Sequence, residues 1–197
     1  MDLIARVQQH FADSMETKQH AAEKLAAPIA AAIETLTRVL IGEGKILSCG
    51  NGGSAADAQH FAAELVGRFE RERQELAAVA LTTDSSILTA VSNDYAFEQI
   101  FARQVRALGK PGDALIAIST SGNSANVLEA VRAAQETGMT VIALTGRDGG
   151  EIGARLAADD LHLNVPAERT ARIQEVHLLI LHCLCDGIDS LLIGDEA

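Results

Sequence analysis

Aromatic side chains are scarce, because the sequence has no tryptophan, one tyrosine and only five phenylalanines. A core built on aromatic packing is therefore excluded. The apolar residues are aliphatic instead, and they recur between turn signals in the way typical of helices packed on a parallel sheet. Hydrophobic residues make up 48% of the 197 residues, and the mean hydropathy is +0.13. A sizeable core can be buried, and the length favours a single domain spanning 1–197.

Positive charge is also in short supply. The sequence has 16 Lys and Arg residues and 27 Asp and Glu residues, which gives a net charge of −11. Nucleic acid and anionic membranes are therefore unfavourable direct partners. An anionic substrate would have to be held by local hydrogen-bond donors, because no general positive field is present.

The three cysteines, Cys49, Cys183 and Cys185, form neither a CxxC pair nor an even disulfide set. Reduced thiols in the cytoplasm are therefore expected. The N-terminal residues mix acids with apolar side chains and lack the apolar region of a signal peptide. No uninterrupted apolar run approaches the ~18 residues of a membrane span, so we expect no membrane segment.

Apolar residues at helical spacing predict two helices within 1–43, ended by Gly42 and Gly44. Such a helical hairpin would cover the core or take part in a contact between subunits. Five short apolar runs then alternate with helical patterns, and a long last helix spans about 168–192. This alternation predicts a parallel, doubly wound α/β core over 44–197, with ligands bound beyond the carboxyl ends of the strands. The five expected strands cover 45–49, 76–81, 113–119, 140–144 and 160–165.

Two loops follow expected strands and open helices. The loop "GNGGSA" (50–55) fits G-x-G-x-x-A, and Glu70 lies 20 residues after Gly50. This is the outline of a dinucleotide fingerprint, although an ordinary turn needs glycines as well. The loop "STSGNSAN" (119–126) offers four hydroxyls beside a helix N-terminus, which suits a phosphate monoester. Helix capping alone remains the alternative, and neither loop carries the GKS/T ending of a nucleotide-hydrolysing P-loop.

Two helical segments carry polar groups among apolar neighbours. His60 and Glu64 share one face four residues apart, and burying such a pair calls for a function. The last helix carries Gln174, Glu175 and His182, and spacing alone aligns Glu175 with His182 better than Gln174, which diverges by ~80°. His177 is expected at the surface or an interface and receives no role. Cys183 and Cys185 are a poor zinc signature and are expected in the core or at an interface.

The segments "KILSCGNGGSAADAQHFAAEL", "ISTSGNSANV", "VIALTGRDGG" and "RIQEVHLLILH" resemble the sugar isomerase (SIS) domain. More narrowly, they are similar to phosphoheptose isomerases, which act on sedoheptulose 7-phosphate. The resemblance covers nearly the whole chain, including its N-terminal segment. It implies a flavodoxin-like, five-stranded parallel sheet, a homotetramer and one zinc ion per subunit.

The resemblance also implies the site residues, and it chooses Gln174 over Glu175, against the helical spacing. Glu64 and His182 would be catalytic. The implied metal ligands are His60, Glu64, Gln174 and His182. The implied substrate contacts are Asn51, Gly52, Gly53, Ser54, Glu64, Asn93, Asp94, Ser119, Thr120, Ser121, Ser124 and Gln174.

By this resemblance, the chain would be an aldose–ketose isomerase. It would convert sedoheptulose 7-phosphate to D-glycero-D-manno-heptose 7-phosphate, the first step toward the heptose of the lipopolysaccharide core. Glu64 would take the C1 proton, and His182 would transfer protons at the opposite face or to the sugar oxygens. Zinc would polarise the C2 carbonyl.

A non-catalytic SIS paralogue that binds the bacterial replication initiator protein provides an alternative. The segments "TARIQEVHLL" and "HCLCDGID" resemble it, and Ala171 stands where many isomerases have Asp. That paralogue typically lacks the carboxylate and imidazole found here at Glu64 and His182, so the enzyme is favoured. A related sugar-phosphate isomerase, a sugar-phosphate sensor and a dinucleotide enzyme are weaker alternatives.

Overall fold

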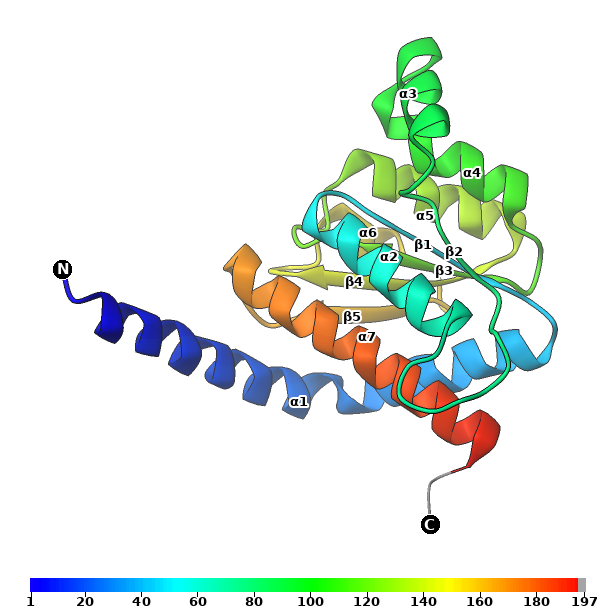
Figure 1. The fold of residues 1–197 in the computed structure, drawn as a ribbon. Helices are drawn as coiled ribbons and strands as arrows, with labels where there is room; N and C mark the ends of the chain where they lie inside the picture. The colour runs from blue at the N-terminus through cyan, green and yellow to red at the C-terminus, as the bar shows by residue number, and fades with distance from the viewer. Residues whose placement is uncertain (195–197) are drawn as a thin grey trace.

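The computed structural model describes residues 1–194, in which five parallel strands form one sheet with helices on both faces (Figure 1). The strands are β1 (Ile46–Gly50), β2 (Ala78–Ala80), β3 (Ala114–Ile118), β4 (Thr140–Gly146) and β5 (Leu161–Val165). Their order across the sheet is β2-β1-β3-β4-β5. This is the flavodoxin-like order, so the predicted doubly wound sheet is confirmed.

Two clusters of buried side chains lie on opposite faces of the sheet. Ile46, Ile116 and Ile142 point to the face covered by α1 (Leu3–Ile41), α2 (Gly53–Val66) and α7 (Thr170–Ile193). The intervening strand residues point to the other face, which is covered by α4 (Ile100–Leu108), α5 (Ala125–Thr137) and α6 (Gly150–Arg155). Strands β1 and β3 are buried along their whole length, which explains their continuous apolar sequences.

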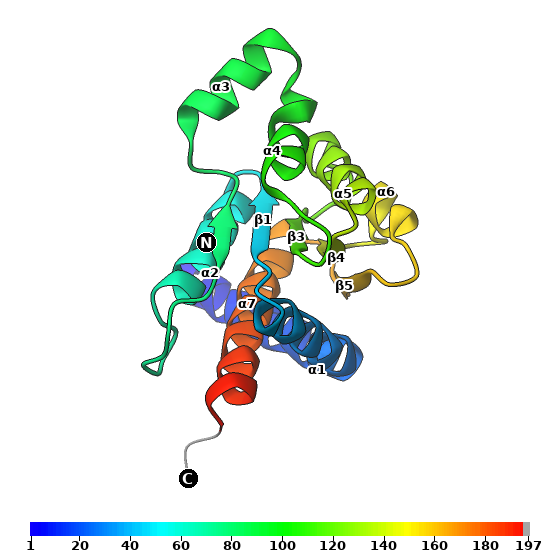
Figure 2. The same ribbon diagram turned by 90° about the vertical axis from the view of Figure 1, so that its right-hand side faces the viewer.

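The first 43 residues are not the predicted hairpin. They form one helix, α1, of 39 residues, which begins after Asp2 and contains Pro28. The Asp2 carboxylate accepts hydrogen bonds from the N–H groups of Ile4 and Ala5 and so caps the helix. The buried residues of α1 lie between Ala21 and Val39, and they pack on α7. The N-terminal half of α1 projects away from the sheet (Figures 1 and 2).

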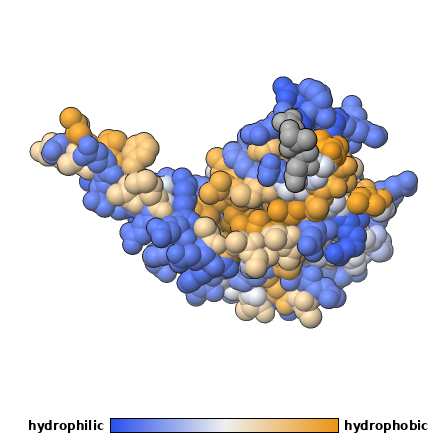
Figure 3. Space-filling view, turned by 90° about the horizontal axis from the view of Figure 1, so that it is seen from below, coloured by the Kyte–Doolittle hydropathy of each residue, from blue (hydrophilic) through white to orange (hydrophobic). Residues whose placement is uncertain are grey.

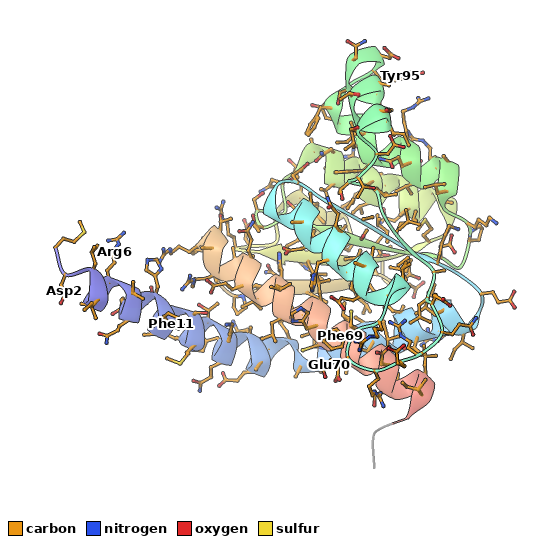
Figure 4. All side chains as sticks on the ribbon, viewed as in Figure 1. Asp2, Arg6, Phe11, Phe69, Glu70 and Tyr95 are labelled. Atoms are coloured by element: carbon orange, nitrogen blue, oxygen red, sulfur yellow. The ribbon has the colours of Figure 1, made fainter. Side chains whose placement is uncertain are left out.

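A second projection consists of α3 (Ser85–Asp94) and the 3₁₀ helix η1 (Phe97–Gln99), which follow β2 (Figures 1 and 2). None of the residues of α3 is buried, and its main contacts are with η1 and α4. Tyr95 and Phe97 are 61% and 56% exposed. Tyr95 lies near the tip of this projection (Figure 4).

Among residues 1–194, α7 alone is long and apolar enough to cross a membrane, with a mean hydropathy of 1.7 over 18 residues. No such segment was expected from the sequence, because no uninterrupted apolar run approaches ~18 residues. In the fold, Ile173, Ile180 and Leu184 of α7 lie in the same buried cluster as strands β4 and β5. Packing under the sheet therefore accounts for the apolar character of α7.

Candidate active site

The sheet reverses its winding direction between β1 and β3. Strand β1 leads into α2 on one face of the sheet, whereas the neighbouring β3 leads into α5 on the opposite face. The loops after these strands therefore diverge and leave a crevice at the carboxyl ends, where ligands of doubly wound sheets bind. Both loops predicted to contact the substrate, 50–55 and 119–124, lie at this point.

The glycines of the first loop let neighbouring atoms come closer to the backbone than a side chain would allow. A methyl group on Gly50 would come within 2.7 Å of the Ser54 carbonyl oxygen, and one on Gly53 within 2.5 Å of Gln174 Nε2. Gly52 has a φ of +55°, which favours glycine. These contacts place Gln174 of α7 at the start of α2, beside Asn51, Gly52, Gly53 and Ser54.

The second loop gathers its hydroxyls at the start of α5. Ser119 is buried, and its Oγ donates to Ser124 Oγ at 3.0 Å. Ser124 is the N-cap residue of α5, yet its side chain makes no capping bond. The capping-only interpretation is therefore wrong for Ser124. Thr120 and Ser121 are half-buried on the same loop, so a dianion here would meet several hydroxyls and a helix N-terminus.

Two histidines from different helices meet below the crevice. His60 Nε2 of α2 lies 3.0 Å from His182 Nε2 of α7, and Glu64 Oε1 lies 3.5 Å from His60 Nε2. Glu64 is on the same helix face as His60, as the four-residue spacing predicted. The Phe69 ring covers His182 from the loop after α2, with the two ring centroids 5.6 Å apart. Phe69 lies where this loop crosses α7 (Figure 4).

The neighbouring residues Gln174 and Glu175 point in different directions. Glu175 accepts hydrogen bonds from Ser14 Oγ of α1, at 2.7 Å, and from Arg172. Gln174 instead contacts Gly53. The structure therefore turns Gln174 toward α2, whereas the helical spacing had favoured Glu175. Gln174 lies eight residues before His182, about 12 Å along the helix axis, so it is nearer the loops than the histidine pair is.

Asn93 and Asp94 lie apart from these groups, at the end of the projecting α3. Asn93 Nδ2 donates to Asp94 Oδ1 at 2.8 Å, and both side chains are exposed. Because the main contacts of α3 are with η1 and α4, a single chain does not bring these two residues to the histidine pair.

With this geometry established, comparison with known proteins identifies the family. The model of the SIS domain matches residues 9–146. A phosphoheptose isomerase of Dechloromonas aromatica is 69% identical over 196 residues, covering 100% of both chains. The chain belongs to the phosphoheptose isomerase family of SIS-domain proteins.

Solved structures of this family share the fold. The structure of a phosphoheptose isomerase from Neisseria gonorrhoeae has a TM-score of 0.91 at 61% identity, covering 95% of this chain and 99% of that one. The one from Francisella tularensis has a TM-score of 0.94 at 46% identity, covering 96% and 100%. The fold of this chain is therefore shared with solved phosphoheptose isomerases over nearly its whole length.

The structure adds residues that sequence reasoning missed. Asp57 lies one turn before His60, and burial raises the pKa of its carboxyl while His60 opposes the shift. The i, i+3 spacing of Asp57 and His60 was the available signal. Asn126 pairs with Asn51 across the crevice, and no sequence signal links two residues 75 positions apart.

His177 also differs from expectation, because it is fully buried and not at a surface or an interface. Its Nε2 donates to the Thr145 carbonyl oxygen at 2.9 Å. Burial lowers the pKa of His177 to about 4, although this hydrogen bond opposes the shift. His177 is therefore neutral at physiological pH, and it packs against β4 and not in the crevice.

The donors at the histidine pair fit zinc in their chemical type. Two imidazole nitrogens and a carboxylate are common zinc ligands, and nitrogens in a tetrahedral site stand about 3.3 Å apart. The 3.0 Å between His60 Nε2 and His182 Nε2 is close to that spacing. Within residues 1–194, however, no three His, Cys, Asp or Glu side chains already form a metal-binding group.

Proposed function

We propose that this protein is the isomerase that converts sedoheptulose 7-phosphate to D-glycero-D-manno-heptose 7-phosphate, the first step toward the heptose of the lipopolysaccharide core. The observation that carries this proposal is the cluster of His60, Glu64 and His182, in which the two imidazole Nε2 atoms lie 3.0 Å apart and the Glu64 carboxylate lies 3.5 Å from His60. Membership of the phosphoheptose isomerase family along the full chain supports the same activity.

The loop 119–124 would hold the phosphate. A phosphate monoester carries two negative charges and several acceptor oxygens, which suits the hydroxyls and the helix N-terminus of this loop. Binding at this end fixes the sugar, so that C1 and C2 lie against a defined set of side chains. The protein has a net charge of −11, and local donors must therefore provide the attraction.

Glu64 and His182 would move the protons. Glu64 accepts the proton from C1 of the ketose, which gives an enediol, and return of a proton to C2 gives the aldose. His182 transfers a proton at the opposite face or between the sugar oxygens. The side chains of Glu64 and His60 are 22% and 41% exposed, which would leave the cluster accessible to a substrate.

We also propose one zinc ion per subunit, held by His60, Glu64 and His182, with the Gln174 carbonyl as the weakest donor. When bound, the ion supplies a Lewis acid for the C2 carbonyl. Glu64 and His182 would then combine ligand and acid–base roles on the same side chains. The donor types of these side chains support a zinc site, and metal analysis of the purified protein tests whether zinc is bound.

The protein would act in the cytoplasm as a homotetramer. Three cysteines without a CxxC pair or an even disulfide set suit the reducing cytoplasm, and several exposed apolar side chains call for burial between subunits. Assembly would also give the exposed α3, with Asn93 and Asp94, a neighbouring chain to contact. Binding to the replication initiator is not favoured, because relatives that match this chain along its full length are phosphoheptose isomerases.

The direct experiment is to incubate the purified, zinc-loaded protein with sedoheptulose 7-phosphate and to follow formation of the aldose. Turnover that disappears with a chelator and returns with zinc is the expected result. Absence of aldose under these conditions, with the protein folded and metal-loaded, would contradict the proposed function.

A further inference from the structure

Two side-chain amides join the loops of the candidate site. Asn51 Nδ2 donates to Asn126 Oδ1 at 2.8 Å, and Asn126 Nδ2 donates to Asn51 Oδ1, also at 2.8 Å. Asn51 lies in the loop after β1, and Asn126 lies in the first turn of α5. The two amides therefore form a closed pair of hydrogen bonds between segments that are distant in sequence.

The amide pair joins two loops that the strand pairing does not join. Helices α2 and α5 leave the sheet on opposite faces, so nothing in the backbone ladder joins the loops that precede them. Strands β1 and β3 pair as far as Gly50 and Ile118, and the chain segments diverge beyond these residues. The amide pair thus spans the crevice just past the last strand pairing.

The two asparagines differ in what they can do. Asn126 is only 2% exposed, so its side chain is out of reach of a substrate. Asn51 is half-buried, and pairing uses one of its two amide N–H groups and one lone pair of its oxygen. Asn51 can therefore contact a ligand while Asn126 holds it in place.

We propose that Asn126 is a positioning residue that holds the glycine loop 50–54 and the hydroxyl loop 119–124 at a fixed separation, through its amide pair with Asn51. This inference rests on the proposed function, since it concerns how the same site binds a sugar phosphate. A preformed cradle avoids the cost of ordering two loops when the substrate binds. The effect of losing the pair therefore falls mainly on KM.

The first test compares Asn126→Ala with Gln104→Ala. Gln104 is a buried amide of α4 whose Nε2 donates to the Leu81 and Ile100 carbonyl oxygens, neither of which belongs to the two loops. Losing either amide should lower stability to a similar extent. Only Asn126→Ala should raise KM for sedoheptulose 7-phosphate, by about tenfold, with kcat changed less than about threefold. Asn126→Ser serves as a second variant if the alanine variant does not fold.

The second test asks whether Asn126 acts through Asn51. In a double-mutant cycle, Asn51→Ala/Asn126→Ala should have a KM no higher than Asn51→Ala alone. Hydrogen exchange gives a readout that does not need activity, because amides of 50–54 should exchange faster in Asn126→Ala than in Gln104→Ala. An unchanged KM, unchanged exchange in 50–54, or additive effects in the cycle each overturns the inference.

Failure of the inference and failure of the proposed function are distinguishable. If the wild-type protein turns over the substrate and Asn126→Ala has the same KM, the function stands and the positioning role does not. If the wild type forms no aldose, the function fails, and hydrogen exchange in loop 50–54 still decides whether Asn126 orders that loop.

Discussion

At the scale of single residues, neighbours decide which polar groups can react. Glu64 and Glu175 are both carboxylates on apolar helices, but Glu175 is held by Ser14 and Arg172. Glu64 faces His60, and its side chain is partly exposed. A carboxylate bound by a cation and a hydroxyl is a poor base, whereas one facing an imidazole beside a ligand site suits proton transfer.

Glu64→Gln and His182→Asn should each lower kcat by at least ~10²-fold, because positioned acid–base groups contribute ~10²–10⁴-fold. Steady-state kinetics with sedoheptulose 7-phosphate measures the loss. Glu175→Gln is the matched control, and it should keep its activity because Glu175 faces α1. Full activity in Glu64→Gln would remove Glu64 from the mechanism.

Ser119→Ala and Ser121→Ala should each raise KM about tenfold, because a hydrogen bond to a charged group contributes ~1.5–3 kcal/mol. Their double variant tests the phosphate cradle most directly. Ser92→Ala, on the projecting α3, is a control that leaves KM unchanged if the cradle alone binds phosphate. A double variant with wild-type kinetics would disprove the assignment of loop 119–124 to the phosphate.

His177 makes stability depend on pH. Its pKa is about 4 in the folded protein, below the ~6.5 of an unfolded chain, so the unfolded state binds more protons between these values. Stability should therefore be complete above about pH 6.5 and fall as the pH drops toward 4. Between pH 6.5 and 5, protonation of His177 in the unfolded state should lower the free energy of unfolding by about 2 kcal/mol.

Urea denaturation at pH 7, 6 and 5, at one protein concentration, measures this effect. His177→Gln is the comparison, because glutamine can still donate to the Thr145 carbonyl and does not titrate. Over this pH range, the free energy of unfolding should fall by about 2 kcal/mol less in the variant than in the wild type. Parallel curves for both proteins would show that another group is responsible.

At the scale of elements, the strands and the long last helix were predictable because each has a distinct apolar pattern bounded by turn residues. The prediction of an N-terminal helical hairpin was wrong, and the reason can be found in the sequence. Residues 16–24 are rich in Glu, Lys, Gln and Ala, which favour helix, and no glycine or proline marks a turn there. The large apolar residues at helical spacing stop at Met15 and resume at Leu25, and such a gap resembles a break between two helices.

The choice between Gln174 and Glu175 could not be made from spacing. Successive residues on a helix differ by about 100°, and either side chain can reach the face that carries His182. The contacts of Gln174 with Gly53, and of Glu175 with Ser14, depend on where α2 and α1 lie. The Asn51–Asn126 pair is hidden for the same reason, since it exists only once the sheet has formed.

The loop after α2 is tied to α7 by a buried ion pair. Arg73 Nε donates to Asp189 Oδ1 at 2.7 Å, and the side chains are 2% and 3% exposed. The Arg73 guanidinium also donates to the Glu64, Leu65 and Gly67 carbonyls at the end of α2. One side chain thus caps the helix that carries Glu64 and fixes it against the helix that carries His182.

Arg73→Met should lower the free energy of unfolding by about 3–5 kcal/mol, because it leaves the Asp189 charge buried without a partner. Arg73→Met/Asp189→Leu should recover at least half of this loss, since no charge then stays buried. Urea denaturation at a fixed protein concentration measures both variants. If the double variant were as unstable as the single one, the carbonyl contacts and not the ion pair would dominate.

At the scale of the whole molecule, apolar surface is left uncovered. Side chains on the projecting half of α1 are more than half exposed: Leu3, Ile4, Val7, Phe11 and Met15. Farther along α1, a groove of about 200 Å³ between α1 and α7 is lined by Leu25, Ile29, Leu179 and Ile180. Apolar side chains gather on the hollowed face of the molecule between α1 and the body (Figure 3).

Light scattering at micromolar concentration should therefore give a mass of about four times the 20.8 kDa chain. Val7→Lys and Phe11→Lys place charge on the exposed stripe and should shift the protein toward smaller species, whereas Glu16→Lys on the same helix should not. A stable wild-type monomer would contradict the proposed tetramer and would leave Asn93 and Asp94 without a neighbouring chain.

The packing of α1 on α7 has a consequence for synthesis. The first and last helices of the described chain contact each other, and Leu25 and Leu36 share a buried cluster with Ile180 and Leu184. Residues so far apart in sequence meet only after nearly the whole polypeptide has left the ribosome. Until then α1 emerges as an amphipathic helix with no surface to cover it. Closure of the domain is therefore a late, post-translational event, and ribosome-bound chains that end before α7 should stay sensitive to protease.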